Sequence, residues 1–259
     1  MESQHHPDLK AYSDLLELAS DWKKKLQSAK ETPPAPNRTW YAYDILASLW
    51  HLEGVFKQLP AGNLEMFRKG HFADIGTADG DLAFFFESLG STVDLIDWPA
   101  TNWNGLAGAR TLKQRLDAKG ASIHEVDLDS QFRLPSTRYD VIFLLGILYH
   151  LKNPFYILET LAHHGRYCCL STRIARRTAD RKVKLEAAPV AYLLDPQECN
   201  NDPTNYWIFS AAGLLRLVDR TGWNVLASHR VGDTKKSDPS SEKHDERMFL
   251  VLESRHLRT

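Results

Sequence analysis

Cysteine is scarce in this chain, which has only Cys168, Cys169 and Cys199 among its 259 residues. No Cys-x-x-Cys pair occurs, so the sequence indicates neither a disulfide framework nor a structural zinc site. Cys168 and Cys169 are adjacent in the apolar run 167–170, where buried strand thiols are the simplest interpretation. We therefore expect a reduced protein without a bound metal.

Long apolar runs and an excess of one charge are also missing. No stretch approaches the ~20 apolar residues of a membrane span, and the first residues lack the basic segment and apolar core of a signal peptide. The formal net charge is −1, so no overall field attracts nucleic acid or an anionic membrane. We expect a cytoplasmic protein that makes no membrane contact. The oligomeric state is not encoded in any visible pattern.

Apolar segments with strand and helix periodicity alternate along most of the chain. With 43% hydrophobic and 25% charged residues, the chain can bury a full core. Strands are expected at 71–75, 92–96, 121–126, 139–145, 166–172, 223–230 and 247–253. Helices are expected at 8–30, 43–59, 81–89, 104–118, 153–163 and 210–221. This alternation predicts an α/β fold whose mostly parallel sheet has helices on both faces. The last two strands have no helix between them, which predicts a final antiparallel strand in a seven-stranded sheet.

The chain divides naturally near residue 60. Residues 1–60 are expected to form an N-terminal helical extension with a proline-rich linker at 31–37. Residues 61–259 are expected to form the main domain. Within it, residues 173–208 break the alternation and are expected to be an insertion that walls the substrate site.

The segment 71–81 carries the clearest motif. An apolar strand ends in Asp74-x-Gly76-x-Ala78-x-Gly80, and a helix follows from Asp81. Glycine permits positive φ and close approach of a ligand, and the start of a helix offers unpaired N–H groups. The segment predicts a nucleotide-binding corner, although an ordinary tight turn remains the alternative.

Acidic residues also end the next two strands. Asp97 lies 23 residues after Asp74, near the ~20-residue offset at which a carboxylate accepts ribose hydroxyls. Asp127 follows the third strand. Three acids at successive strand ends predict an adenosine site. Trp98 and Leu128, which follow these acids, and Leu145, which ends the fourth strand, are assigned to the same pocket.

The glycine spacing resembles motif I of class I S-adenosylmethionine (SAM) methyltransferases, in which Ala78 replaces the usual middle glycine. The resemblance implies a Rossmann-like fold, SAM as cofactor, an adenine contact near Asp127 and an antiparallel seventh strand.

Leu145-Gly-Ile-Leu-Tyr-His150 resembles a narrower family, the methyltransferase-like enzymes that build 5-carboxymethoxyuridine at the tRNA wobble position. This resemblance spans Trp40 to Arg255. It implies that Tyr149 lies beside the sulfonium-borne group, that Arg247 can pair with the carboxylate of carboxy-SAM, and that Trp40 contacts the substrate. The family's N-terminal lysine has no clear counterpart here. Plain SAM is therefore favoured, and carboxy-SAM is the alternative.

Tyr149 and His150 are the expected catalytic residues. Methyl transfer from a sulfonium is an in-line displacement that depends on alignment, with an aromatic ring near the cation and a base if the acceptor carries a proton. Both residues follow the fourth strand, where ligands of open α/β sheets bind. A structural histidine remains the alternative for His150.

The insertion 173–208 supplies the expected substrate-binding residues. Amide, aromatic and charged side chains gather there, namely Arg173, Tyr192, Asn200, Asn201, Asn205 and Trp207. Six basic residues between 173 and 184 could contact RNA phosphates, but a solvated, mobile loop is the simpler interpretation. The sequence thus favours a small-molecule acceptor, with tRNA as the alternative. A nicotinamide dehydrogenase and a non-catalytic SAM-binding or NAD-binding protein are the other classes left open.

Overall fold

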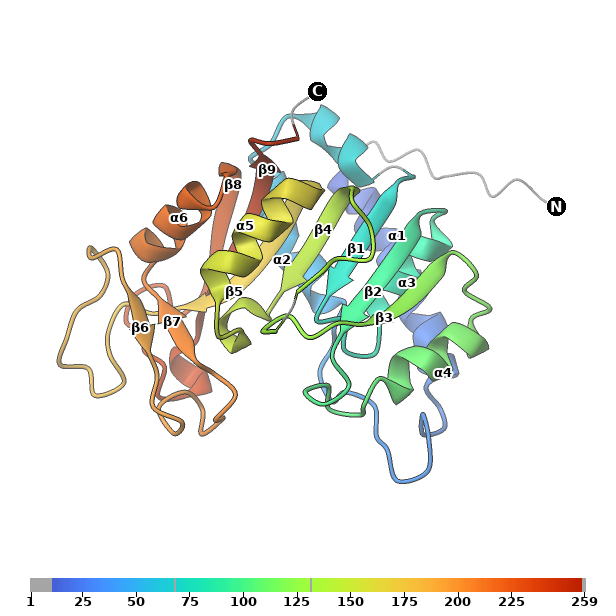
Figure 1. The fold of residues 1–259 in the computed structure, drawn as a ribbon, viewed down its shortest axis with the longest axis horizontal. Coiled ribbons are helices and arrows are strands. Elements are labelled where there is room, and N and C mark those ends of the chain that lie inside the picture. The colour runs from blue at the N-terminus through green and yellow to red at the C-terminus, as the bar shows by residue number, and fades with distance from the viewer. Residues whose placement is uncertain (1–10, 68, 131, 258–259) are drawn as a thin grey trace. The chain divides into compact units, whose positions relative to one another are not determined.

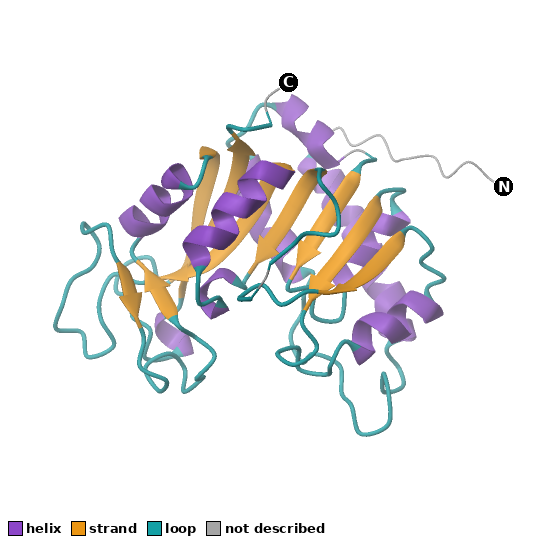
Figure 2. Cartoon of the chain, in the orientation of Figure 1, coloured by secondary structure: helices purple, strands orange, loops and turns teal. Residues whose placement is uncertain are grey.

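A computed structural model describes residues 11–67, 69–130 and 132–257. The chain forms two compact units, residues 1–143 and 144–259. Figure 1 gives the element labels and Figure 2 the secondary structure.

The first unit is built on parallel strands. β1 (His71–Ile75) pairs with β2 (Thr92–Asp97) and with β4 (Tyr139–Leu145), and β2 pairs with β3 (Ala121–Glu125), so the order is β3-β2-β1-β4. Strand β1 is almost wholly buried, as expected for a parallel strand covered on both faces. Each of these four strands begins and ends within one residue of the expected position. The parallel order brings the ends of β1, β2 and β3 to one edge, where the predicted acids lie.

Helices cover this sheet. α3 (Asp81–Ser88) buries Phe84, Phe85 and Phe86, and Phe86 stacks on Phe143 of β4 with ring centroids 4.8 Å apart. α4 (Ala107–Arg115) follows β2. It is shorter at both ends than the expected helix 104–118. At its start, the side chains of Asn102 and Asn104 accept from the backbone N–H groups of Leu106 and Gly108.

The N-terminal extension packs into the first unit. α1 (Tyr12–Ala29) buries one apolar stripe. The ring centroid of Trp22, which belongs to that stripe, lies 6.4 Å from the ring centroid of Phe85. α2 (Ala47–Phe56) is shorter than the expected helix 43–59, and a 3-10 helix, η1 (Ala61–Phe67), follows. Residues 8–10 of the expected first helix lie outside the described residues. The boundary proposed at residue 60 stays a prediction.

The second unit contains the expected antiparallel end. β5 (Gly165–Ile174) pairs antiparallel with β9 (Glu246–Ser254), which pairs antiparallel with β8 (Trp223–Gly232). α5 (Pro154–His164) and α6 (Ala211–Arg220) complete the unit, with short 3-10 helices η2 (Leu148–His150) and η3 (Glu242–His244). Cys168 and Cys169 are fully buried in β5, which confirms them as strand thiols.

The segment 173–208 differs most from expectation. It contains two short strands that the sequence analysis missed, β6 (Ala191–Leu193) and β7 (Trp207–Phe209), which pair antiparallel. β7 also pairs with the end of β5 at Ile174. Beneath this hairpin lies a small core that includes Leu185, Leu194 and Ile208. The expectation of seven strands therefore lacked this pair, and the interpretation of the basic run 173–184 as a mobile loop stays a prediction.

None of the described helices is long and apolar enough to cross a membrane.

Candidate active site

The turn after β1 has the backbone that its glycines predicted. Gly76, Ala78 and Gly80 all have positive φ, at 72°, 54° and 86°. A Cβ at Gly80 would lie 2.6 Å from Leu95 Cδ2 and 2.7 Å from Phe84 Cε2, so only glycine fits there. Ala78 takes the left-handed conformation with a side chain, which costs roughly 1–2 kcal/mol. The turn leads directly into the first turn of α3.

Asp74 and Asp97 lie on either side of this turn. Asp74 is 5% exposed and accepts a hydrogen bond from Thr77 Oγ1 at 2.7 Å. Burial, reinforced by the nearby Asp97 and Asp81, raises the pKa of Asp74 to about 7. Asp97 accepts from the Asn102 amide at 2.9 Å and from the backbone N–H groups of Trp98 and Ala78. Burial raises the pKa of Asp97 despite these bonds.

The other predicted cofactor residues of this unit follow β2 and β3. Trp98 is 36% exposed and Leu128 is buried. Asp127 forms a compact turn, accepting from Asp129 N and from Ser130 Oγ. The structure therefore places all of these residues at the ends of neighbouring strands, as expected.

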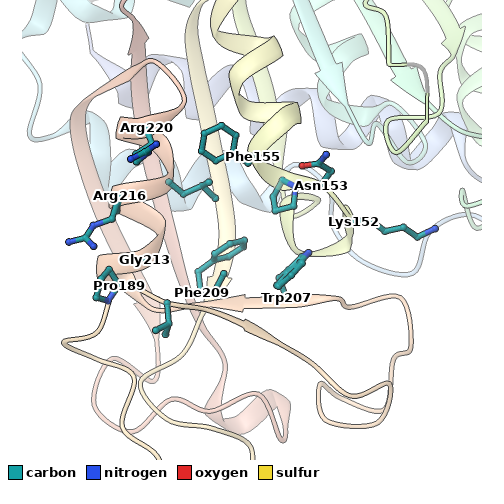
Figure 3. A pocket seen from close by; sticks show the side chains of 13 residues that line it. Lys152, Asn153, Phe155, Pro189, Trp207, Phe209, Gly213, Arg216 and Arg220 are labelled. Atoms are coloured by element: carbon teal, nitrogen blue, oxygen red, sulfur yellow. The ribbon is translucent and has the colours of Figure 1, made fainter.

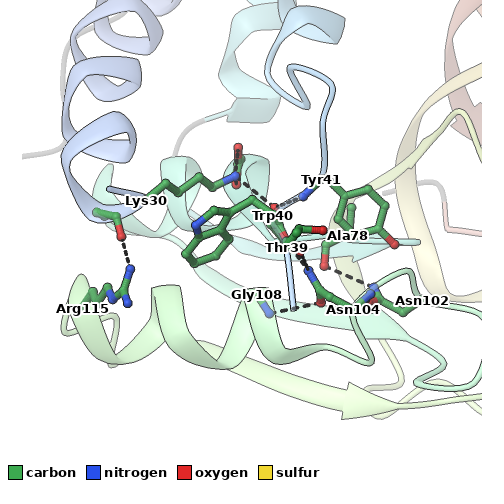
Figure 4. A network of polar contacts seen from close by, with 12 residues as sticks. Lys30, Thr39, Trp40, Tyr41, Ala78, Asn102, Asn104, Gly108 and Arg115 are labelled. Carbon is green, nitrogen blue, oxygen red and sulfur yellow. Dashed lines mark hydrogen bonds and ion pairs between the residues drawn. The ribbon is translucent and has the colours of Figure 1, made fainter. Parts of the chain in front are cut away.

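A buried ionic network behind the turn was not predicted (Figure 4). Lys30 Nζ lies 3.1 Å from Asp79 Oδ2 and 2.7 Å from Asp81 Oδ1. Asp79 also accepts from Tyr41 N and from the Asn104 amide. The network joins the end of α1 and the linker to the glycine turn. In the sequence, only the two neighbouring acids Asp79 and Asp81 pointed to this network. Their cationic partner, Lys30, lies far away along the chain.

Trp40 lies beside the same network. Its indole Nε1 donates to Thr32 O at 3.0 Å, and the Lys30 ammonium and Arg115 guanidinium lie 5.3 and 5.6 Å from its ring. These contacts hold the linker against α1 and α4. A substrate contact for Trp40 stays a prediction.

In the second unit, Tyr149 and Arg247 lie close together. Leu145 ends β4, Tyr149 follows in η2, and the Arg247 guanidinium carbon lies 5.9 Å from the centroid of the Tyr149 ring. Arg247 Nε also donates to Asp245 Oδ2 at 3.2 Å. Arg247 therefore already has a carboxylate partner from its own strand end.

His150 has a defined tautomer. Its Nδ1 lies 3.1 Å from Thr204 O and 3.0 Å from Thr204 Oγ1. A carbonyl can only accept, and the Thr204 hydroxyl donates to Asp202 Oδ1 at 2.7 Å, so Nδ1 carries the proton and Nε2 has a free lone pair. Burial lowers the pKa of His150, and Arg247 and Arg173 lower it further, against the opposing effects of Thr204 and Asp202. These contacts favour the neutral ring, and a role of His150 as a base stays a prediction.

The predicted substrate-wall residues have mixed surroundings. Arg173 is 2% exposed, with Nε 2.5 Å from Asp245 Oδ1 and Nη1 donating to Cys199 Sγ. Asn205 is buried and donates to Cys199 O and Asp202 O. Asn200 and Asn201 are exposed turn residues with φ of 54° and 56°, a conformation that asparagine tolerates.

Tyr192 and Trp207 lie on the hairpin. Tyr192 in β6 donates to Glu198, and the side-chain nitrogen of Trp207 in β7 is buried without a hydrogen-bond partner among the described residues. The structure brings Arg173, Asn205 and the Tyr149–Arg247 pair into one connected network through Asp245 and Cys199. Substrate contacts of the individual residues stay predictions.

The basic run is largely neutralised. Arg176 pairs with Glu246 and Glu186, and Arg181 pairs with Asp238 at 2.7 Å. Together with the Arg173–Asp245 pair and the Lys182–Asp180 pair at 3.4 Å, four of the six basic residues between 173 and 184 have acidic partners. In the part of the chain that the structure describes, no group of three or more His, Cys, Asp or Glu residues is placed to hold a metal ion.

Solved structures of similar fold are remote in sequence. The N-terminal domain of EvdMO1, crystallised in the presence of S-adenosylhomocysteine (SAH) and D-fucose, is 14% identical, with 93% of this chain and 97% of that chain covered and a TM-score of 0.58. A Burkholderia thailandensis 1,6-didemethyltoxoflavin-N1-methyltransferase, with bound 1,6-didemethyltoxoflavin and SAH, is 15% identical over 96% and 92% of the two chains, with a TM-score of 0.52. The [4+2]-cyclase SpnF is 12% identical over 93% and 94%, also with a TM-score of 0.52. No curated protein matches the sequence.

The methyltransferase-domain family model matches residues 45–228. This match covers most of the chain and confirms both the expected Rossmann-like α/β fold and the expected enzyme class, whereas the narrower tRNA wobble-uridine family is not confirmed. The chain therefore belongs to the methyltransferase-domain family and is a class I SAM-dependent methyltransferase.

Proposed function

We propose that this protein transfers a methyl group from SAM to a small-molecule acceptor. SAM supplies an electrophilic methyl carbon on a sulfonium, so the protein has to bind the cofactor, align the acceptor and take up a proton where the acceptor carries one. The residues described above fit these tasks.

The acids of the first unit suit the polar groups of SAM. Asp74 is a buried carboxyl whose pKa is raised to about 7, so it gains from a cationic partner, and the α-ammonium of SAM is one. Asp97, beside Ala78, suits the vicinal ribose hydroxyls, since a carboxylate can accept two hydrogen bonds. Asp127 suits the adenine amino group. SAH in the crystals of the EvdMO1 domain and of the Burkholderia enzyme supports the same cofactor class.

Replacement of Asp97 tests the cofactor assignment. Asp97→Ala is expected to weaken SAM binding in calorimetry by about 2–3 kcal/mol, because charged hydrogen bonds are lost. Asp117→Ala is the control, since Asp117 is an exposed residue that pairs with Lys119. SAM affinity that is the same in Asp97→Ala as in the wild type would refute the assignment.

Arg247 bears on the choice between SAM and carboxy-SAM. Because Asp245 accepts from Nε of this guanidinium, part of its charge is already compensated within the chain, and the extra carboxylate of carboxy-SAM would gain less from it. This pairing supports plain SAM. Competition titration with both cofactors should show tighter binding of SAM, and a strong preference for carboxy-SAM would reverse the assignment.

The small-molecule acceptor rests on one observation, the internal pairing of the basic run. Arg173, Arg176 and Arg181 each contact a carboxylate, so they do not form a free basic face for phosphates. The net charge of −1 adds no general attraction. The structural neighbours crystallised with D-fucose present or with 1,6-didemethyltoxoflavin bound support the same acceptor class.

Binding of bulk tRNA distinguishes the two acceptor classes. We expect weak binding that disappears by about 0.15 M salt, because few phosphates can be neutralised. The informative variant is Arg177→Glu/Lys184→Glu, since these two side chains make no ion pair among the described residues. Submicromolar tRNA binding at physiological salt that this double variant abolishes would favour an RNA acceptor.

His150 is the proposed base for an acceptor that carries a proton. Nδ1–H is bound by Thr204, and this bond leaves Nε2 to accept. Tyr149, the neighbouring residue in η2, has its ring beside the Arg247 guanidinium. Asp202 holds the Thr204 hydroxyl and is a positioning residue in this scheme.

A further inference from the structure

A cavity in the second unit is lined by none of the residues assigned to the methyl-transfer site except Trp207 (Figure 3). Its volume is 390 Å³, within the roughly 300–1,000 Å³ of ligand pockets. Its walls come from the start of α5, from one face of α6, and from the β6–β7 hairpin with the residues before it. Tyr149, His150 and Arg247 are not among the lining residues.

The walls of the cavity are apolar and firmly held. Phe155, Phe209 and Leu217 contribute apolar surface. The hairpin is fixed against α6, because Ser210 N donates to Val190 O and a Cβ at Gly213 would lie 2.2 Å from that same oxygen. Only glycine allows this close approach of helix and hairpin. The cavity is therefore a feature of packed elements and not of a loose loop.

Two arginines lie on the α6 side of the opening. Arg216 and Arg220 are four residues apart, so they project from the same face of α6. Both are exposed, and neither guanidinium has a hydrogen-bond or ion-pair partner among residues 11–67, 69–130 and 132–257. Two like charges at this spacing repel each other slightly. In the same unit, by contrast, Arg173, Arg176 and Arg181 all contact carboxylates.

Trp207 contributes a further unmet group. Its ring lines the cavity (Figure 3), and its Nε1 is buried without an acceptor among the described residues. A buried donor without a partner is costly. The cavity thus combines an apolar interior, to which the Trp207 ring contributes, with a pair of unpaired cations at its edge.

We propose that this cavity binds a small amphipathic anion, an aryl-alkyl carboxylate or a molecule of similar chemistry. The apolar body would lie against Phe155, Phe209 and Leu217, and the carboxylate would pair with Arg216 and Arg220, whose planar guanidinium groups suit carboxylates. This site is separate from the residues proposed to hold SAM, and the inference does not depend on the proposed reaction.

The test compares a charged probe with its neutral counterpart on the full chain. We expect 4-phenylbutyrate to bind saturably, by calorimetry or saturation-transfer NMR, and roughly fivefold to tenfold more tightly than 4-phenylbutanamide. Arg216→Ala/Arg220→Ala should remove this preference and leave amide binding unchanged. Arg133→Ala/Arg138→Ala, which removes two exposed arginines of the first unit, is the matched control and should keep the preference.

Other results would overturn the inference. These are equal binding of acid and amide, a preference that survives in Arg216→Ala/Arg220→Ala, or no saturable binding of either probe. SAM affinity, measured on the same samples, should be identical in all variants. If the wild-type protein does not bind SAM, that result contradicts the proposed function, whereas it does not bear on this cavity.

Discussion

Lys30, the residue after helix α1, lies with its ammonium 2.7 Å from the carboxylate of Asp81, which begins helix α3. The same ammonium contacts Asp79, whose side chain is fully buried. One cation thus compensates two buried acids at the turn that follows β1. Burial still raises the pKa of Asp81, although Lys30 opposes the shift.

Removal of this cation should destabilise the protein. Lys30→Met leaves two buried carboxyl groups without a counter-ion, and we expect a loss of roughly 3 kcal/mol in the free energy of unfolding, measured with urea. The control is Lys24→Met in helix α1, where the ion pair with Asp21 is exposed and screened by solvent, so its loss should have little effect on the free energy of unfolding. Equal effects of the two substitutions would contradict the role given to Lys30.

Two substitutions in the glycine turn should have opposite signs. Ala78→Gly relieves the left-handed strain at φ 54° but adds freedom to the unfolded chain, so we expect a change between zero and about 1 kcal/mol of stabilisation. Gly80→Ala should destabilise by about 2–4 kcal/mol, because strain and overlap with Leu95 and Phe84 add. Thermal and urea unfolding of both variants provide the comparison. A stabilised Gly80→Ala would show that the turn is arranged differently.

The raised pKa of Asp74 predicts a pH dependence of stability. Between the unfolded value near 4 and the folded value of about 7, the folded state holds a proton that the unfolded state has lost. Asp74 therefore contributes a free energy of unfolding that falls as pH rises through this window. Asp74→Asn should remove that slope. Urea titrations between about pH 4 and 8 measure it, and parallel slopes for wild type and variant would contradict the prediction.

SAM binding should release a proton from the same group. A cationic ammonium beside Asp74 favours its ionised form, so binding at about pH 6 should release up to one proton, and binding at about pH 8 almost none. Calorimetry in buffers of different ionisation enthalpy measures this number. Asp74→Asn should abolish the release at the lower pH. Proton release that persists in Asp74→Asn would assign it to another residue, of which Asp97 is the first to test.

The tautomer of His150 can be observed without knowledge of the acceptor. Long-range ¹H–¹⁵N NMR should show the proton on Nδ1 and a pKa below the ordinary value of about 6.5, so the neutral ring persists to lower pH. Asp202→Asn should alter the Nδ1 environment through Thr204, whereas Asp195→Asn, in the same insertion, should not. A proton on Nε2 would exclude Nε2 as the base.

The parallel sheet and the position of the acids at its strand ends were predictable because they depend on short-range patterns. Buried runs, glycines with positive φ and acids at strand ends are all local in sequence, and β1, β2 and β4 lie where these signals placed them. Lys30 shows the limit of such reasoning. Its partners Asp79 and Asp81 lie about 50 residues away, and nothing near Lys30 in the sequence distinguishes it from the exposed Lys24 and Lys25 of helix α1.

The insertion shows the same limit in a different form. β6 and β7 are each three residues long, too short for a recognisable alternation, and are stabilised by pairing with each other and with the end of β5. The sequence suggested that the basic run 173–184 could contact phosphates. It did not show the pairing of this run, because the acids Asp238, Asp245 and Glu246 come from a distant part of the chain.

The peptide groups around Tyr206 connect the hairpin to the Tyr149–His150 segment through main-chain atoms. Tyr206 N donates to Tyr149 O, and Leu194 N donates to Tyr206 O, both at 2.9 Å. Because neither bond uses a side chain, these two hydrogen bonds do not depend on the identity of the residues in the hairpin. A graft of segment 189–209 that preserves the length between Leu194 and Tyr206 is therefore expected to keep the main-chain position of Tyr149, whereas the orientation of His150 also requires Asp202 and Thr204 to be kept.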